Sequence, residues 1–300
     1  MPYDADGGAD AKPTTAPAAR RAKHPLLHAW SEYADLLEHA DAIDIDVLER
    51  HRVAATAADA CARPRFRAQD AALLDDGLHY ESRIAERAEL ATRPSNPHDV
   101  FNALVWLRHP GLKQALNARQ VADIARVGPK QRTRGQCALT HFDEAGAIVW
   151  LADAALLPLW DAHDWRALFL DRRAAWGTSI ALTVFGHALV EHVWNGHDLP
   201  VAKTLVVQLP SAQPIAPAAG AGALIGRLPG AEVALAAAIA SGRLLADPQE
   251  LRPLPMAGIP AWHARGEDPA FLQDAPCFRP LRPGRRYPGP LQLAATDRAV

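Results

Sequence analysis

The chain has 300 residues, of which 49% are hydrophobic and 22% charged, and its formal net charge is −2. Because this nearly neutral charge creates no overall field that attracts phosphate backbones or anionic membranes, neither nucleic acid nor a membrane is an expected partner. Three widely spaced cysteines, Cys61, Cys137 and Cys277, argue against a disulfide framework and a thiolate zinc site, and they favour a cytoplasmic location. The most apolar stretch, 231–240, is shorter than the roughly 20 residues that cross a bilayer.

The N-terminal part combines a polar tail with helical patterns. Residues 1–23 lack the apolar segment of a secretory signal, so we expect a disordered tail there. In residues 25–40, apolar side chains recur at the spacing of one helix face, which predicts an amphipathic helix. A second helix is expected to begin after Asp44 or Asp46.

Residues 65–90 have the rhythm of strands. Phe66 and then the segment 78–84 alternate polar and apolar residues, and Asp76-Gly77 between them is a turn signal. This pattern predicts two strands joined by a turn.

The next region predicts two helices. Asn96 can cap a helix over 97–108, with Asp99 at its third position, where a carboxylate meets the free N–H groups of the first turn. A pattern at Asn117 that is similar to a capping box predicts another helix, which ends near Gly128.

The rest of the chain alternates strands and helices. Residues 135–142 are expected to form a short helix, and 143–146 a type I turn, because Asp opens this tetrapeptide and Gly closes it. Further strands are predicted at 147–152, 180–185 and 203–209, and further helices at 165–176, 187–194 and 231–245.

These elements define one expected domain. Residues 24–282 are predicted to form a single α+β domain, in which a mixed or antiparallel sheet is surrounded by helices. The Pro-, Ala- and Gly-rich segment 210–230 is expected to be a flexible loop or insertion, and the basic, Pro-rich residues 283–300 a disordered tail.

Two polar pairs stand at the edges of apolar helix faces. His98 and Asn102 are four residues apart, as are His187 and Glu191, so each pair lies about 40° apart around its helix. A histidine and a carboxylate at this spacing can bind one first-row divalent ion. We therefore predict that His98, Asp99, His187 and Glu191 lie near a metal ion, and zinc, manganese and iron are all compatible with these ligands.

Three further residues are predicted to take part in catalysis. Asp143 or Glu144 could act as general base on a bound water molecule. Asn102 joins them, because an amide inside an apolar helix needs partners for its donors and acceptor.

Most candidates also have a structural interpretation, and His98 could be a cap residue of its helix. Asp99 is a normal third residue of a helix, and Asp143 is a normal turn residue. His187 and Glu191 could form an ordinary surface pair, and Asn102 could hold a neighbouring loop by its backbone.

These segments carry a resemblance to a known family. The matching residues are Tyr80-Glu81 with Arg93, the run His98-Asp99-Val100-Phe101-Asn102-Ala103-Leu104-Val105-Trp106-Leu107, Pro110 with Lys113 and Leu116-Asn117, Phe142-Asp143-Glu144-Ala145-Gly146, Phe185-Gly186-His187-Ala188-Leu189 with Glu191, and Gly258-Ile259-Pro260 with Trp262. The chain resembles the bacterial family known as domain of unknown function 3025 from about residue 25 to about 282. It departs from the pattern at Gly135-Gln136-Cys137, where an Arg-Asp pair is expected. The resemblance implies a shared fold and no mechanism.

Three hypotheses follow for the function. The first is a metal-dependent hydrolase or other acid–base enzyme that acts on a small molecule, and it fails if His98 and His187 lie more than about 10 Å apart. The alternative is a non-catalytic binding or assembly protein, in which the same residues are helix caps and buried hydrogen-bond anchors. A nucleic-acid-associated protein rests only on the Arg-rich ends of the chain.

Overall fold

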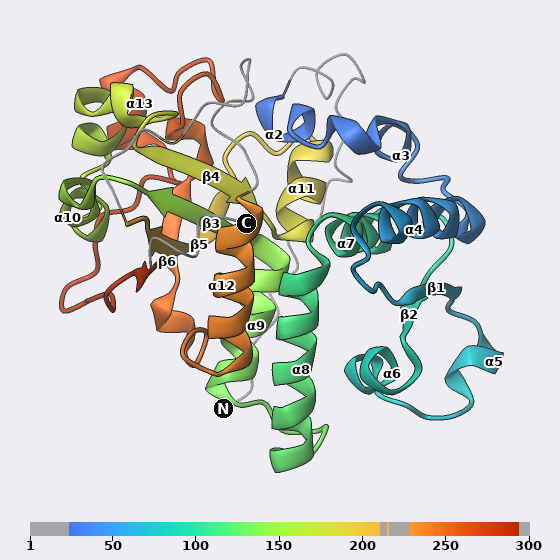
Figure 1. Cartoon of the computed structure of the whole chain (residues 1–300). Coiled ribbons are helices and arrows are strands. Elements are labelled where there is room, and N and C mark those ends of the chain that lie inside the picture. The colour runs from blue at the N-terminus through green and yellow to red at the C-terminus, as the bar shows by residue number, and fades with distance from the viewer. Residues whose placement is uncertain (1–23, 211–214, 216–227, 294–300) are drawn as a thin grey trace, which may run out of the picture.

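The larger part of the molecule is built around a five-stranded mixed sheet. The computed structural model describes residues 24–210, 215 and 228–293 (Figure 1). The strands of this sheet are β3 (Gly146–Leu151), β4 (Ile180–Val184), β5 (Val201–Gln208), β6 (Arg252–Pro255) and β7 (Leu291–Gln292). Strand β3 lies between antiparallel β4 and parallel β5, and the other edge of β5 pairs with antiparallel β6 and then with parallel β7.

Every residue of β3 and β4 is buried. A strand that is covered on both faces needs an apolar run rather than an alternating pattern, and Ala147-Ile148-Val149-Trp150-Leu151 is such a run. The sheet therefore has helices or loops on both of its faces.

The helices that matter for the site lie in the middle of the molecule. They are α7 (Pro97–Arg108), α8 (Pro110–Val127), α9 (Arg134–Ala145), α11 (His187–Trp194) and α12 (Pro229–Ala240). Helix α9 contacts β3 and β5, α8 packs against α9 and α12, and α11 packs against α7 and α9 (Figure 1). Helices α7, α9 and α11 thus meet beside one end of the sheet.

A smaller layer flanks this centre. It contains a two-stranded parallel sheet of β1 (Arg65–Ala68) and β2 (Glu89–Thr92), with α4 (Ile45–Asp59), α5 (Ala71–Leu74) and α6 (Tyr80–Arg87) around it (Figure 1). Helix α4 packs on α7, and α6 packs on α8. The buried apolar residues of both parts belong to one core that extends from Leu26 to Leu293.

Short elements complete the described chain. They are α2 (Pro25–His28), η1 (Ser31–Tyr33), α3 (Ala34–Glu38), η2 (Ala154–Leu156), α10 (Leu157–Asp161), the π-helical turn η3 (Ala167–Asp171), η4 (Arg173–Ala175), η5 (Pro248–Glu250), η6 (Met256–Gly258) and α13 (Pro269–Asp274). No helix among the described residues combines the length and the apolar character needed to span a membrane.

The predicted α+β class with a mixed sheet among helices is confirmed, and so are several individual elements. The helix over 97–108 has the predicted bounds and the predicted cap, since Asp99 N donates to the side chain of Asn96 at 3.2 Å. The helix over 187–194 and the strands near 147–152, 180–185 and 203–209 are also present, with ends that differ by one or two residues.

The strand predicted at 78–84 is wrong. This segment belongs to α6, which begins after His79, whose Nδ1 accepts from Glu81 N at 3.3 Å. The helix ends at Ala88 in the left-handed conformation, with a φ of 51°. The alternation of polar and apolar residues is too short to distinguish the period of a strand from that of a helix. Arg83 adds to the ambiguity, because it is buried against Asp76 and so occupies a core position.

The turn predicted at 143–146 is also wrong. Asp143, Glu144 and Ala145 are the last residues of α9, and β3 begins directly at Gly146. The helix predicted to start at Asn117 instead runs from Pro110 to Val127 as one α8, with Asn117 in its interior. Proline at the first position of α8 supplies the start signal, because its missing N–H has no role there.

Three other segments differ in extent. The helix predicted at 25–40 is divided into α2, η1 and α3. The helix predicted at 231–245 ends at Ala240, and the helix predicted at 165–176 is a π-helical turn followed by η4. Two residues of the predicted tail, Leu291 and Gln292, form β7, which pairs with β5. Residues 1–23, 294–300 and most of the predicted loop at 210–230 lie outside the described residues, although Ile215 is buried and its N–H donates to Thr178 O at 2.7 Å.

Candidate functional site

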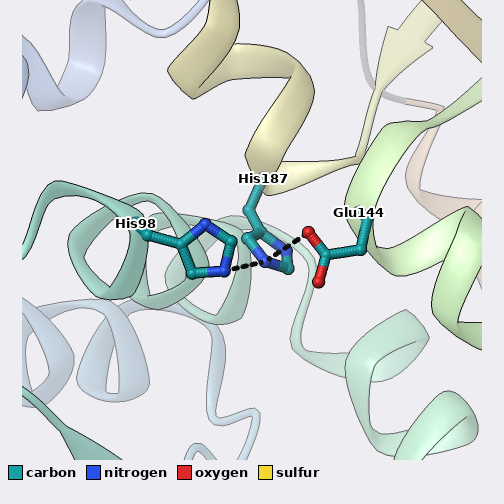
Figure 2. Close-up of side chains that lie close together, drawn as sticks. All are labelled: His98, Glu144 and His187. Carbon is teal, nitrogen blue, oxygen red and sulfur yellow. Dashed lines mark hydrogen bonds and ion pairs between the residues drawn. The ribbon is translucent and has the colours of Figure 1, made fainter. Parts of the chain in front are cut away.

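Three potential metal ligands converge where α7, α9 and α11 meet. His98 comes from the first turn of α7, Glu144 from the last turn of α9, and His187 is the first residue of α11 (Figure 2). His187 Nε2 lies 3.1 Å from His98 Nε2 and 3.3 Å from Glu144 Oε2. One ligand atom from each residue falls within 4.8 Å of the other two. The three side chains therefore surround one point.

Two glycines allow α11 to begin against the end of α9. Gly186 N donates to Gly146 O at 2.7 Å, which joins the residue before α11 to the first residue of β3. A Cβ on Gly186 would lie 2.3 Å from Gly146 N and 2.5 Å from Glu144 O, distances that real structures do not tolerate. The sequence Phe185-Gly186-His187 therefore brings His187 to the carboxyl end of α9, beside Glu144.

Each histidine has a carboxylate behind it. His98 Nδ1 lies 2.8 Å from Glu191 Oε2, and His187 Nδ1 lies 3.9 Å from Asp143 Oδ2. At hydrogen-bonding distance, the carboxylate of Glu191 holds a proton on His98 Nδ1 and leaves the Nε2 lone pair for a metal ion, whereas the 3.9 Å between His187 Nδ1 and Asp143 Oδ2 is too long for a hydrogen bond. In both histidines Nε2 is the atom that faces the common point.

A chain of polar contacts continues from Asp143 through buried Lys113 toward the smaller layer and ends at the exposed Tyr80. Lys113 Nζ donates to Asp143 Oδ1 at 2.6 Å and to Asn102 Oδ1 at 2.8 Å, and Asn102 Nδ2 donates to the Tyr80 hydroxyl at 2.8 Å. Lys113 is only 5% exposed, so its charge requires the carboxylate of Asp143. Helices α6, α7, α8 and α9 are thus connected behind His187.

Burial and charge shift the pKa values of this group in different directions. The hydrogen bond with Glu191 raises the pKa of His98 above its ordinary value. Burial lowers the pKa of His187 to about 4, so this imidazole is neutral near pH 7. Burial raises the pKa of Glu144. Burial also disfavours the charged form of Asp143, but Lys113 and the histidines outweigh it and lower the pKa of this carboxyl group.

Five of the seven residues predicted for the site lie in one neighbourhood. His98 and His187 are in direct contact, far inside the limit of about 10 Å that a shared metal requires. Glu144, which was predicted as a base, is the carboxylate at the common point, and Glu191 and Asp143 lie behind the two histidines.

Two predicted residues have other partners. Asp99 accepts hydrogen bonds from the backbone N–H of Arg93 at 2.7 Å and from its side-chain Nε and Nη2 at 3.0 and 2.8 Å, so Arg93 occupies its carboxylate. Asn102 is held between Lys113 and Tyr80. Spacing alone pointed to neither Lys113 nor Tyr80 as part of the site, although both belong to the motif residues that carry the family resemblance.

The fold and this site define an α+β protein in which two histidines and one glutamate from three helices converge beside a mixed sheet. The sequence pattern of the family described as "Protein of unknown function (DUF3025)" matches residues 64–282, which is most of the chain and includes every residue of the site. The protein belongs to this family. Neither a curated protein nor a solved structure matches the chain.

Proposed function

We propose that the protein is a metal-dependent hydrolase of a small molecule, with one divalent ion bound by His98, Glu144 and His187. The separations of 3.1 and 3.3 Å between ligand atoms carry this proposal. Ligand atoms at about 2.0–2.1 Å from a tetrahedral zinc ion lie about 3.3 Å from one another. The side chains thus have the spacing of a ligand shell.

The donor set supports a catalytic ion rather than a purely structural one. Two histidines and one glutamate leave a fourth position for water, whereas structural zinc sites fill all four positions with side chains. Imidazole and carboxylate donors are also compatible with manganese and iron. Bound in this way, the ion would lower the pKa of water toward about 7, which supplies a nucleophile near neutral pH.

The surrounding residues would act as positioning residues. Glu191 would fix the orientation and the Nδ1 proton of His98, Asp143 would act on His187 through its charge, and Lys113 would keep Asp143 ionised. Because Asp143 is engaged with Lys113, its predicted role as general base has less support than this positioning role. Activation of water would then rest on the ion.

The alternative of a non-catalytic binding or assembly protein has support at two residues. Asp99 and Asn102 are held by Arg93 and Lys113, as hydrogen-bond anchors are. These contacts need no substrate, and they would be the same in a protein that only binds.

The proposal is tested by metal-dependent hydrolysis. Purified protein is treated with a chelator, reloaded separately with zinc, manganese and iron, and offered small esters, amides and phosphoesters. We expect hydrolysis of at least one class that falls more than about 100-fold after chelation and in Glu144→Gln and His187→Ala, while the exposed-histidine control His39→Ala keeps it. Activity that survives chelation or Glu144→Gln would contradict the proposal.

A further inference from the structure

A second concave region lies away from the three potential ligands. It has a volume of about 910 Å³ and lies between β5, the segment around η5 and the C-terminal segment 276–287. Its lining contains no aspartate or glutamate, and five of its residues carry a positive charge: Lys203, Arg279, Arg282, Arg285 and Arg286. We refer to it as the basic cavity.

Among the described residues, no ion pair joins a carboxylate to the five cations of this cavity, although Asp247, which pairs with Arg134, also interacts with the charge of Arg285. Arg279 and Arg285 donate to the backbone carbonyl groups of Pro276 and Gln249, which carry no net charge. Within the described part of the chain, Lys203, Arg282 and Arg286 form no ion pair. Burial lowers the pKa of Lys203, and repulsion from Arg282 and Arg279 lowers it further. An anion in the cavity would relieve this repulsion.

The concentration of charge is local. The whole chain has a formal net charge of −2. The five cationic side chains of the cavity, whose lining has no carboxylate, are therefore not explained by an excess of basic residues in the protein as a whole. A general basic surface would attract any polyanion, whereas a concave group of arginines selects a ligand that fits inside it.

The wall of the cavity is held in place by specific contacts. Arg279 O accepts from Trp165 Nε1 at 2.9 Å and lies 3.1 Å from His163 Nδ1. The Tyr287 hydroxyl lies 2.9 Å from His163 Nε2, and the Tyr287 ring has the guanidinium of Arg285 at 4.3 Å. Because these contacts fix the backbone that carries the arginines, less ordering is needed when a ligand binds.

We propose that the basic cavity binds a small anion that bears two or more phosphate groups. Guanidinium groups match phosphate oxygens in pairs, and a volume of about 910 Å³ is within the range of small-molecule sites. Five positive charges can balance the three to four negative charges of a free diphosphate group. This inference does not depend on the proposed metal site.

The test is a calorimetric titration of the full chain with inorganic pyrophosphate, after chelation of metals. The test variant is Lys203→Gln with Arg282→Gln, both of which line the cavity. The matched control is Arg50→Gln with Arg87→Gln, which removes the same charge from exposed positions on α4 and α6. Circular dichroism establishes that all variants are folded.

We expect one pyrophosphate per chain, with affinity at least about tenfold weaker in the cavity variant and unchanged in the control and in His187→Ala. Wild-type protein should also melt at a higher temperature with pyrophosphate present, a readout that needs no variant. A parallel titration with ADP separates two sources of the phosphate groups: tighter binding than pyrophosphate identifies a nucleotide, and equal binding identifies the phosphate groups alone.

Two results would overturn the inference. One is no heat and no thermal stabilisation with pyrophosphate at millimolar concentration. The other is binding that falls equally in the cavity variant and the control, because this outcome indicates general charge attraction rather than a built cavity.

Discussion

Two histidine–glutamate pairs of nearly equal length have different surroundings. His98 Nδ1 lies 2.8 Å from Glu191 Oε2, with 36% and 21% of the two side chains exposed. His109 Nδ1 lies 3.0 Å from Glu232 Oε2, with 0% and 8% exposed. The rings of Trp30 and Phe185 lie beside His109, whereas His187 lies beside His98.

The comparison shows that the pair itself does not determine the role. At His109 the pair connects the junction of α7 and α8 to α12 inside the core, so its contribution is to stability. At His98 the second nitrogen faces a neutral histidine and a glutamate, so the pair orients a potential ligand. The following predictions test this division.

The largest expected effect is on folding. Glu232→Ala should lower the free energy of unfolding by about 3–5 kcal/mol, because it removes one partner of a buried pair. Glu191→Ala should lower it by about 1 kcal/mol or less, because its pair is partly exposed. Urea unfolding of the chelated protein measures both values, and equal losses would remove the distinction between the pairs.

A fall in pH should lower the stability of the folded protein, because His187 is buried in its neutral form. Its folded pKa, about 4, is below the unfolded value of about 6.5, so its contribution is complete above about pH 6.5 and is lost as the pH falls toward 4. The loss amounts to about 3 kcal/mol. His98 has a raised folded pKa, so its smaller contribution is present below about pH 6.5 and is lost at higher pH.

The pH profile of urea unfolding, measured for the chelated wild type and for His187→Gln, separates the contribution of His187 to stability from that of His98. The wild type should lose more stability than the variant between pH 7 and about pH 4. Parallel losses would show that His187 is not buried in its neutral form.

A methyl group at the junction of α9 and α11 should disturb the site. Gly186→Ala should cost about 1–3 kcal/mol, because its Cβ would meet the backbone of Gly146 and Glu144. Gly111→Ala is the matched control, since its Cβ has open space in α8 and the change should be neutral or slightly stabilising. Thermal unfolding compares the two, and equal melting temperatures would contradict the close approach.

The smallest expected effect concerns the chain behind His187. Lys113→Met should weaken metal binding by about 10–100-fold, because Asp143 loses the partner that keeps it ionised. The exposed control Lys130→Met should leave the affinity unchanged. Competition with a chromophoric chelator measures the affinity, and an unchanged value in Lys113→Met would separate Asp143 from the metal site.

The sequence predicted those elements whose signals are local and redundant. Helix 97–108 has a cap, a proline at its first position and an apolar face, and the strand at 147–152 is an apolar run with β-branched residues. The prediction failed where one local signal competed with another. Asp143 to Gly146 reads as a turn, yet the residues before Gly146 complete α9, because Phe142 is buried in the core and extends the helix.

The site was predictable in part for the same reason. The spacing of residues within a helix identified His98, His187 and Glu191 as candidates. It predicted contacts between residues of the same helix, whereas the close contacts of these side chains join different helices. The contact of His98 with Glu191 spans 93 positions and depends on how α7 packs on α11. Asp99 could not be separated from the ligands beforehand, because its position facing Arg93 is fixed by the turn before α7.

The most direct test of the central claim is the metal content of purified, tag-free protein by mass spectrometry, before and after incubation with zinc, manganese or iron. The account predicts close to one ion per chain in the wild type and in His39→Ala, and loss of the ion in His98→Ala and in His187→Ala while both remain folded. A folded wild type that contains no metal and binds none when it is offered would contradict the account and favour the non-catalytic alternative.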